Sequence, residues 1–444
     1  MGGLAFASGP DPLYTPRMPK EVYLQFKAQC FDILRNLYEV IESPIDGPGK
    51  KDFGDVDVAV YGPKEGTITD NTAKALEQIS GALGAVRMIV AKGEASSNFA
   101  VPWPDFPDTQ VVEQASSESE SESKKPKFIQ VDVSIFQEKS RLEWTNFKHA
   151  HGDIWNLIGA TIRPYGLTVD QNAMWLRIPE IEKADKKRGK VFLTADHLQI
   201  LDFLDLPATT YFQGQFPDLD AMYEYVTQCR MFYVPPLDED DELQDGEATG
   251  GGKSVEQGPD KLKANDRRRM NFRPGFRKWV DEFKPECRRL GRFSEQKTTR
   301  EEVTAEAIAR FHVREEYDKR LQDFLAERQR LFIANNVIKE AVPHPTDASQ
   351  QTSITYRACL VKALKKIILE DDQEYGVSAP KDCKEENGMY NVDKVLEFIE
   401  EHKDEVGKIA YDKQKEAYRA KKAKKAEEAK DKTEEGASAC TNEA

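Results

Sequence analysis

The sequence predicts an α+β fold, in which a small mixed β-sheet with flanking helices is followed by a mostly helical second domain. Residues 55–61 and 128–136 have the two-residue alternation of half-buried strands. Residues 266–342, 354–372 and 391–407 carry apolar side chains at helical spacing. The part of the chain with the strands precedes the long helical stretches.

Composition divides the chain into five parts. A Ser/Glu-rich stretch cannot bury apolar surface and is expected to be a disordered insert, and an acidic, Gly-rich stretch is expected to be a linker. The predicted parts are a flexible N-terminus at 1–17, a sheet-containing domain at 18–235 with its insert at 112–126, a linker at 236–265, a helical domain at 266–410 and a charged, largely disordered tail at 411–444.

Within the first domain the elements follow from local periodicity and turn residues. The expected helices are 18–42, 70–83, 151–163 and 218–229, and the expected strands are 55–61, 86–90 and 128–136. A hairpin is expected at 167–169 and 174–178, and a strand from 191 is expected to enter a helix that Thr194 caps.

Charge and cysteine usage restrict the class of protein. The chain has 78 acidic and 64 basic residues, a formal charge of −14, which argues against a general nucleic-acid coat protein. No apolar run approaches the ~18 residues of a membrane span, and the N-terminus lacks the features of a signal peptide. Six scattered cysteines without a Cys-x-x-Cys pair suit a reducing compartment, the cytoplasm or nucleus. Residues 421–425 resemble a nuclear-targeting cluster, although such lysine runs also occur in solvated tails.

Three aspartates form the candidate site. Asp55 and Asp57 lie two apart on a strand and therefore share a face. Asp132 lies on the polar face of the strand 128–136, with Gln130 and Ser134. Close carboxylates repel each other unless a cation lies between them, and Mg²⁺ and Mn²⁺ prefer carboxylate oxygen. The alternative for Asp55 and Asp57 alone is a solvated strand edge after a turn.

A loop rich in glycine and lysine precedes this pair. Glycines permit close approach of the backbone, and lysines supply positive charge, so the loop suits a phosphate ligand. The candidate phosphate-binding residues are Ser43, Gly47, Gly49, Lys50, Lys51 and Gly54.

The combined pattern resembles the DNA polymerase β-like nucleotidyltransferase superfamily. That family has an apolar residue, Gly, then Gly or Ser, a loop of nine to thirteen residues, Asp-x-Asp/Glu and a distant strand-borne Asp. Here Ser43 is followed by eleven residues, 44–54, before Asp55, and Glu42 stands where the family has glycine. With the stretches 193–196 and 201–206, the chain is similar over 18–230 to a poorly characterised branch found in phages, bacteria and fungi.

The resemblance implies a nucleotidyltransferase-type sheet and transfer of an NMP group from an NTP to an acceptor hydroxyl of RNA, a small molecule or a protein. Asp55, Asp57 and Asp132 would bind two Mg²⁺ or Mn²⁺ ions, with Asp132 as third ligand or general base. The loop residues would contact the β- and γ-phosphates. The alternative is a catalytically inactive module of this fold that binds nucleotide or nucleic acid through the helical domain, and Glu42 favours it.

Two further patterns leave alternatives open. Residues 267–300 carry twelve Lys/Arg against four acidic residues, interleaved with Phe272, Phe276, Trp279 and Phe283. They could bind RNA or another nucleic acid, but the aromatic spacing of four, three and four is typical of a helical core stripe. His149 and His151 could bind a separate metal, but the pattern favours an exposed turn at the start of a helix.

Overall fold

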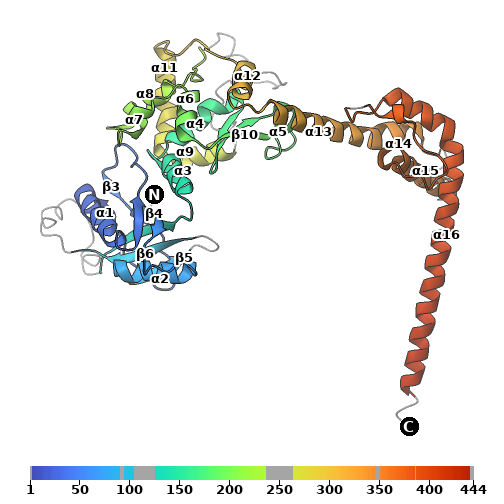
Figure 1. Cartoon of the computed structure of the whole chain (residues 1–444), viewed down its shortest axis with the longest axis horizontal. Coiled ribbons are helices and arrows are strands. Elements are labelled where there is room, and N and C mark those ends of the chain that lie inside the picture. The colour runs from blue at the N-terminus through green and yellow to red at the C-terminus, as the bar shows by residue number, and fades with distance from the viewer. Residues whose placement is uncertain are drawn as a thin grey trace. The chain divides into compact units, whose positions relative to one another are not determined.

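The computed structural model describes residues 3–90, 95–104, 126–236, 264–345, 351–385 and 387–440 (Figure 1). Side chains are described in these ranges except at 264, 265 and 427–440. The chain divides into two compact units, Met1–Val313 and Arg314–Ala444. The predicted α+β class is confirmed, with a five-stranded mixed sheet and a mostly helical C-terminal region. The division falls after Val313 and not in the expected linker 236–265, most of which lies outside the described residues.

The central sheet of the first unit has the strand order β2-β4-β7-β6-β5. Its middle pair, β4 and β7, is parallel, and the other pairs are antiparallel. The strands are β2 (Tyr38–Glu42), β4 (Asp55–Pro63), β5 (Arg87–Val90), β6 (Ser96–Pro102) and β7 (Phe128–Ile135). A two-stranded antiparallel ribbon pairs β1 (Met18–Pro19) with β3 (Asp52–Phe53), and β3 lies just before β4 in the chain.

One face of this sheet makes the core. Helices α1 (Lys20–Leu34) and α2 (Thr72–Leu83) pack against it (Figure 1). The strand residues in this core alternate with the polar ones, so the opposite face carries the aspartates. The core residues of β4 and β7 are Val56, Val58, Val60, Ile129, Val131 and Val133.

Two local expectations were wrong. The expected helix 18–42 ends at Leu34, and residues 38–42 form β2, whose Val40 pairs with Tyr61 of β4. Apolar residues at 37 and 41 fit a helical stripe, but the unpaired edge of β4 offers backbone hydrogen bonds to the extended chain. The cap of the helix after β10 (Lys190–Thr194) is Asp196, which accepts from the N–H groups of Leu198 and Gln199, and not Thr194.

The remainder of the first unit is helical around a three-stranded sheet, β10-β9-β8, which contains the expected hairpin. Helix α3 (Lys139–His149) and strand β6 are additions that the sequence did not predict. The other elements are α4 (Ile154–Ile162), η2 (Arg163–Tyr165), β8 (Leu167–Val169), β9 (Met174–Arg177), α5 (Pro179–Glu182), α6 (His197–Phe203), α7 (Ala208–Phe212), α8 (Leu219–Thr227), α9 (Ala264–Phe272), α10 (Pro274–Lys278), η4 (Trp279–Phe283), α11 (Lys284–Arg289) and α12 (Arg300–Arg310).

The second unit is an all-helical core in its described part. Its buried residues come from helices whose apolar faces meet. The elements are α13 (Arg314–Phe332), η5 (Ile333–Val337), α14 (Ile338–Ala341), α15 (Gln351–Glu370), η6 (Lys381–Cys383) and α16 (Val392–Cys440). Helix α16 continues through most of the tail 411–444 that the sequence assigns to disorder. The expected insert 112–126 lies outside the described residues except for Pro126.

The N-terminal segment is packed rather than flexible as expected. Phe6 is 1% exposed, and the N–H of Phe128 donates to the carbonyl of Tyr14 at 2.9 Å, at the start of β7. Arg17 forms an ion pair with Asp52 of β3. Residues 3–17 therefore belong to the folded first unit.

Candidate functional site

The central sheet brings the three predicted aspartates together. In the parallel pair β4–β7, Asp57 is the register partner of Asp132, and Asp55 is the partner of Gln130. Register partners on neighbouring strands lie about 5 Å apart and point to the same face. The four side chains therefore form a polar block on the sheet face opposite the core.

Asp132 lies among amide donors. Asn98 of β6, its register partner on the other side, donates through Nδ2 to Oδ1 at 2.5 Å. Gln130 donates through Nε2 to Oδ1 at 2.8 Å and to Oδ2 at 3.1 Å. Two neutral amides hold this carboxylate in place without neutralising its charge.

The electrostatics of the block favour protonation. Burial, followed by repulsion from Asp55 and Asp132, raises the pKa of Asp57 to about 7, although Lys50 opposes the shift. The Asp57 side chain is nonetheless exposed to solvent, so the site lies open on the sheet face. Burial also raises the pKa of Asp132, against the hydrogen bonds from Asn98 and Gln130. The site thus has more negative charge than its surroundings neutralise.

The contribution of Asp57 and Asp132 to the free energy of unfolding of the metal-free protein is expected to fall as the pH rises from about 4 to about 7. The native state holds the protons of Asp57 and Asp132 more tightly than the unfolded chain, because both pKa values are raised. This contribution is fully present below the ordinary carboxyl pKa and is lost as the pH rises through the raised one. Thermal unfolding in a chelator measures it. Asp57→Asn should reduce the slope, and Asp52→Asn is the control because Asp52 pairs with Arg17 outside the polar block. Equal slopes in all three proteins would contradict the prediction.

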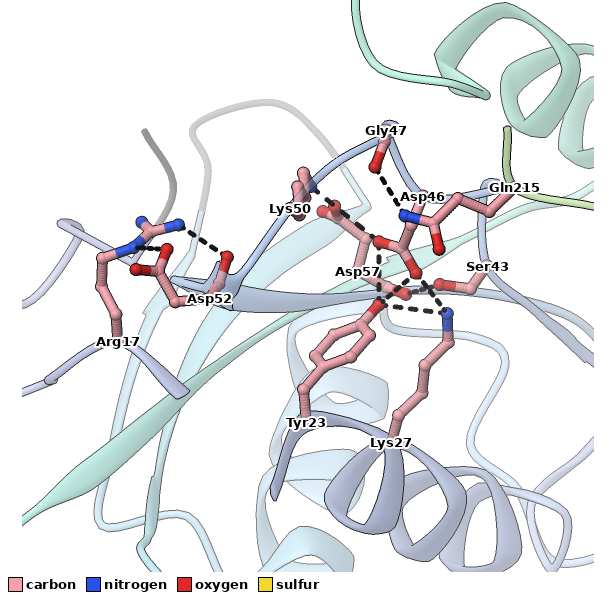
Figure 2. Close-up of polar contacts among 10 residues, drawn as sticks. All are labelled: Arg17, Tyr23, Lys27, Ser43, Asp46, Gly47, Lys50, Asp52, Asp57 and Gln215. Atoms are coloured by element: carbon pink, nitrogen blue, oxygen red, sulfur yellow. Dashed lines mark hydrogen bonds and ion pairs between the residues drawn. The ribbon is translucent and has the colours of Figure 1, made fainter. Parts of the chain in front are cut away.

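The loop before β4 brings a second polar group to the site (Figure 2). Asp46 accepts from the hydroxyl of Tyr23 at 3.0 and 3.1 Å, and Lys27 lies 3.7 Å from it. Lys50 lies 3.9 Å from Asp46, and Ser43 Oγ donates to the carbonyl oxygen of Asp57. Two ammonium groups therefore lie beside the carboxylates, one from α1 and one from the loop.

Sequence reasoning missed Tyr23, Lys27, Asp46, Asn98 and the role of Gln130. The spacing of Tyr23 and Lys27 places both on one face of α1, and Gln130 shares the open face with Asp132. These spacings were signals that could have been used. Nothing local in the sequence marks Asn98, because its contact depends on the pairing of β6 with β7.

The predicted loop glycines have different surroundings. Gly47 is buried, accepts from Gln215 Nε2 at 2.7 Å and packs on Gly152. Gly54 is also buried, and its backbone contacts Gly3. These two backbones are covered by protein, which leaves the exposed Gly49, Lys50 and Lys51 as the open part of the loop.

Glu42 stands where the family that the sequence resembles has glycine. Its carboxylate accepts a hydrogen bond from Asn146 Nδ2 of α3 at 2.8 Å. Next to it, the N–H of His151 donates to the carbonyl of Ile45 at 2.7 Å. The loop is thus fastened to the helical part of the first unit, and the carboxylate of Glu42 has a structural partner.

The donor set fits a hard divalent cation by its chemistry. Carboxylate oxygens are the ligands that Mg²⁺ and Mn²⁺ prefer, and the raised pKa of Asp57 shows charge that a cation would neutralise. In the described part of the chain, no three acidic, histidine or cysteine side chains converge closely enough to bind an ion as they stand. Binding therefore requires the aspartate side chains to move toward one another, and their oxygens retain lone pairs beside the amide donors.

At least six of the twelve cations of the basic stretch 267–300 form ion pairs within the first unit. Acidic residues from the preceding helices and loops face many of its cations, which lowers the positive potential available to a nucleic acid. Arg267, Arg268 and Arg277 remain exposed. The pairs are Arg269–Asp266, Arg273–Asp153, Lys278–Asp220, Arg289–Glu286, Arg292–Glu224 and Arg300–Glu182.

The His149/His151 pair does not form a metal site. The ring of His151 is buried against Tyr211 and Phe216, and its Nε2 lies 2.9 Å from the Tyr211 carbonyl oxygen. Burial lowers the pKa of the His151 imidazole. His151 therefore packs in the helical part of the unit, and His149 lies exposed beside it.

No protein-family model matches the chain, and no curated protein sequence is similar enough to be counted as a relative. Among the described helices, none combines the length and the apolar character that crossing a membrane requires.

Proposed function

We propose that the chain is a metal-dependent nucleotidyltransferase, which transfers an NMP group from an NTP to an acceptor hydroxyl. The observation that supports this best is the pairing of Asp57 with Asp132 across the parallel strands β4 and β7. Asp55 lies two residues before Asp57, on the same face of β4. Three carboxylates on one open sheet face suit an ion that also binds a triphosphate. The adjacent Lys27 and Lys50 suit the phosphates themselves.

The roles of the residues follow from their positions. Asp55 and Asp57 would bind Mg²⁺ or Mn²⁺, which when bound neutralises triphosphate charge and acidifies the acceptor hydroxyl. Asp132 would complete the site or accept the hydroxyl proton, and its raised pKa makes it a stronger base than an ordinary carboxylate. The hydroxyl oxygen then forms a bond to the α-phosphorus, and the bond to pyrophosphate breaks. The exposed lysines Lys50 and Lys51 of the loop can stabilise the leaving pyrophosphate.

The test is incorporation of label from each NTP with Mg²⁺ or Mn²⁺, with RNA, small-molecule and protein acceptors. Loss of a residue that supports a metal ligand typically costs about 10–100-fold in activity. Asp55→Ala/Asp57→Ala removes two proposed ligands and should therefore reduce incorporation by more than this. The matched control is Asp52→Ala. Asp52 lies three residues before Asp55 but pairs with Arg17 at 2.6 Å (Figure 2) and should be dispensable.

Two results would contradict the proposal. One is equal incorporation by the wild type and the Asp55→Ala/Asp57→Ala variant. The other is no incorporation by the wild type with any acceptor class, together with no binding of Mn²⁺ or of Mn²⁺-ATP in calorimetry. Binding without transfer would instead indicate a nucleotide-binding module of this fold.

A further inference from the structure

The N-terminal segment, defined as residues 3–17, lies at the open face of the sheet where the aspartates are. The N–H of Gly3 donates to Asp55 Oδ2 at 3.1 Å. Two residues later, the N–H of Ala5 donates to Gln130 Oε1 at 2.9 Å. The backbone amides of Gly3 and Ala5 therefore both donate to the polar block.

The second of these contacts extends to Asp132. Gln130 accepts from Ala5 through its oxygen, so its amide nitrogen is oriented toward Asp132, to which it donates at 2.8 and 3.1 Å. Gln130 is only 3% exposed, although it lies on the polar face of β7. The N-terminal segment thus covers Gln130 and determines which end of its amide faces the carboxylate.

Three features hold the segment in place. Phe6 is 1% exposed, and its carbonyl accepts from the N–H of Leu13 at 2.9 Å. Thr15 Oγ1 donates to the Gly3 carbonyl at 2.8 Å, which closes the segment on itself. Gly3 has a φ of +82°, and a Cβ there would overlap the carbonyl of Gly54, so a side chain at this position would displace the segment.

We propose that the N-terminal segment is a positioning element of the metal site. Gly3 orients Asp55, and Ala5 orients Asp132 through Gln130. Residues that support metal ligands in this way fix the direction of the ligand oxygens and lower the reorganisation on binding. The inference rests on the proposed function, since it assumes that these aspartates bind the ion. It adds Gly3 and Ala5 as positioning residues, far from the aspartates in sequence.

The test compares Gly3→Ala with Leu4→Ala in the full chain. Leu4 lies in the same segment but its side chain is 64% exposed, so its removal leaves the backbone contacts intact. Mn²⁺ affinity is measured by calorimetry with the metal alone. Gly3→Ala should weaken it about 10-fold or more, as loss of support behind a ligand does, and Leu4→Ala should match the wild type.

A second readout separates positioning from general stability. The transfer rate of Gly3→Ala should recover at high Mn²⁺ concentration, because mass action overcomes weaker binding, while thermal unfolding without metal should match the wild type. Gln130→Met removes the amide that joins Ala5 to Asp132 and should show the same weakening and the same recovery. Thermal unfolding of each variant identifies any loss of folded protein.

The outcomes are distinguishable. Wild-type Mn²⁺ affinity in both Gly3→Ala and Gln130→Met would overturn the inference while the proposed function stands. A higher affinity in Gly3→Ala would also overturn it, because the segment would then mask Asp55 rather than position it. Absence of Mn²⁺ binding by the wild type would overturn the proposed function and the inference together.

Discussion

Replacing Asp57 with asparagine is expected to stabilise the metal-free protein and at the same time to abolish transfer. Asp57 has its pKa raised to about 7 by burial and by the carboxylates of Asp55 and Asp132. Above its raised pKa, ionised Asp57 therefore costs more free energy in the native state than in the unfolded chain. Asparagine keeps the shape and removes this repulsion, but it offers one neutral oxygen in place of a carboxylate.

The measurements are thermal unfolding in a chelator at pH 8 and NMP transfer with Mn²⁺. Asp57→Asn should unfold at a higher temperature than the wild type and should lose more than about 100-fold in rate, beyond what supporting residues contribute. Adding Mn²⁺ should raise the unfolding temperature of the wild type only. A variant that is both less stable and fully active would show that Asp57 has an ordinary structural role.

The second large effect is expected from Trp279→Ala, which should destabilise the first unit by about 3–5 kcal/mol. Trp279 is fully buried in η4. Its ring stacks on Phe283 at 4.9 Å between centroids and lies 5.2 Å from Tyr223 and 5.3 Å from Phe232. Removing the indole leaves a cavity between α8, the segment after it and η4, which cannot close without moving all three.

The matched control is Phe272→Ala. Both residues belong to the aromatic series of the basic stretch, but Phe272 is 56% exposed and should cost little on truncation. Chemical denaturation of the full chain gives the free energy of unfolding of each variant. Circular dichroism monitors both variants, and tryptophan fluorescence also monitors Phe272→Ala. Similar small losses would show that residues 264–313 are not part of the first unit's core.

The aromatic series shows how far periodicity alone can go. Spacing of four and three predicts that Phe276, Trp279 and Phe283 form a core stripe, and Phe276 and Trp279 are indeed buried. The same spacing includes Phe272, which is exposed, because α9 ends there and Pro274 begins a new helix. Periodicity identifies the apolar face of a helix, but the elements that pack on this face decide where it ends. Here those elements belong to the first unit, which extends to Val313.

The sequence by itself determined the local facts of the candidate site. Strand periodicity is a property of neighbouring residues, so the strands at Asp55 and Asp132, the common face of Asp55 and Asp57, and the α+β class were all predictable. The helix expected through residues 38–42 failed because an edge of β4, distant in sequence, offered that stretch hydrogen bonds.

Only the tertiary structure decided what surrounds the aspartates. The register that sets Asp57 beside Asp132 joins residues 75 positions apart, and the contacts of Asn98 and Gly3 depend on how whole strands and the N-terminal segment pack. Such contacts bury polar groups only when several elements meet, so no single stretch carries a signal for them. The physical reason is that repulsion from Asp132, which contributes with burial to the raised pKa of Asp57, exists only once β4 and β7 pair.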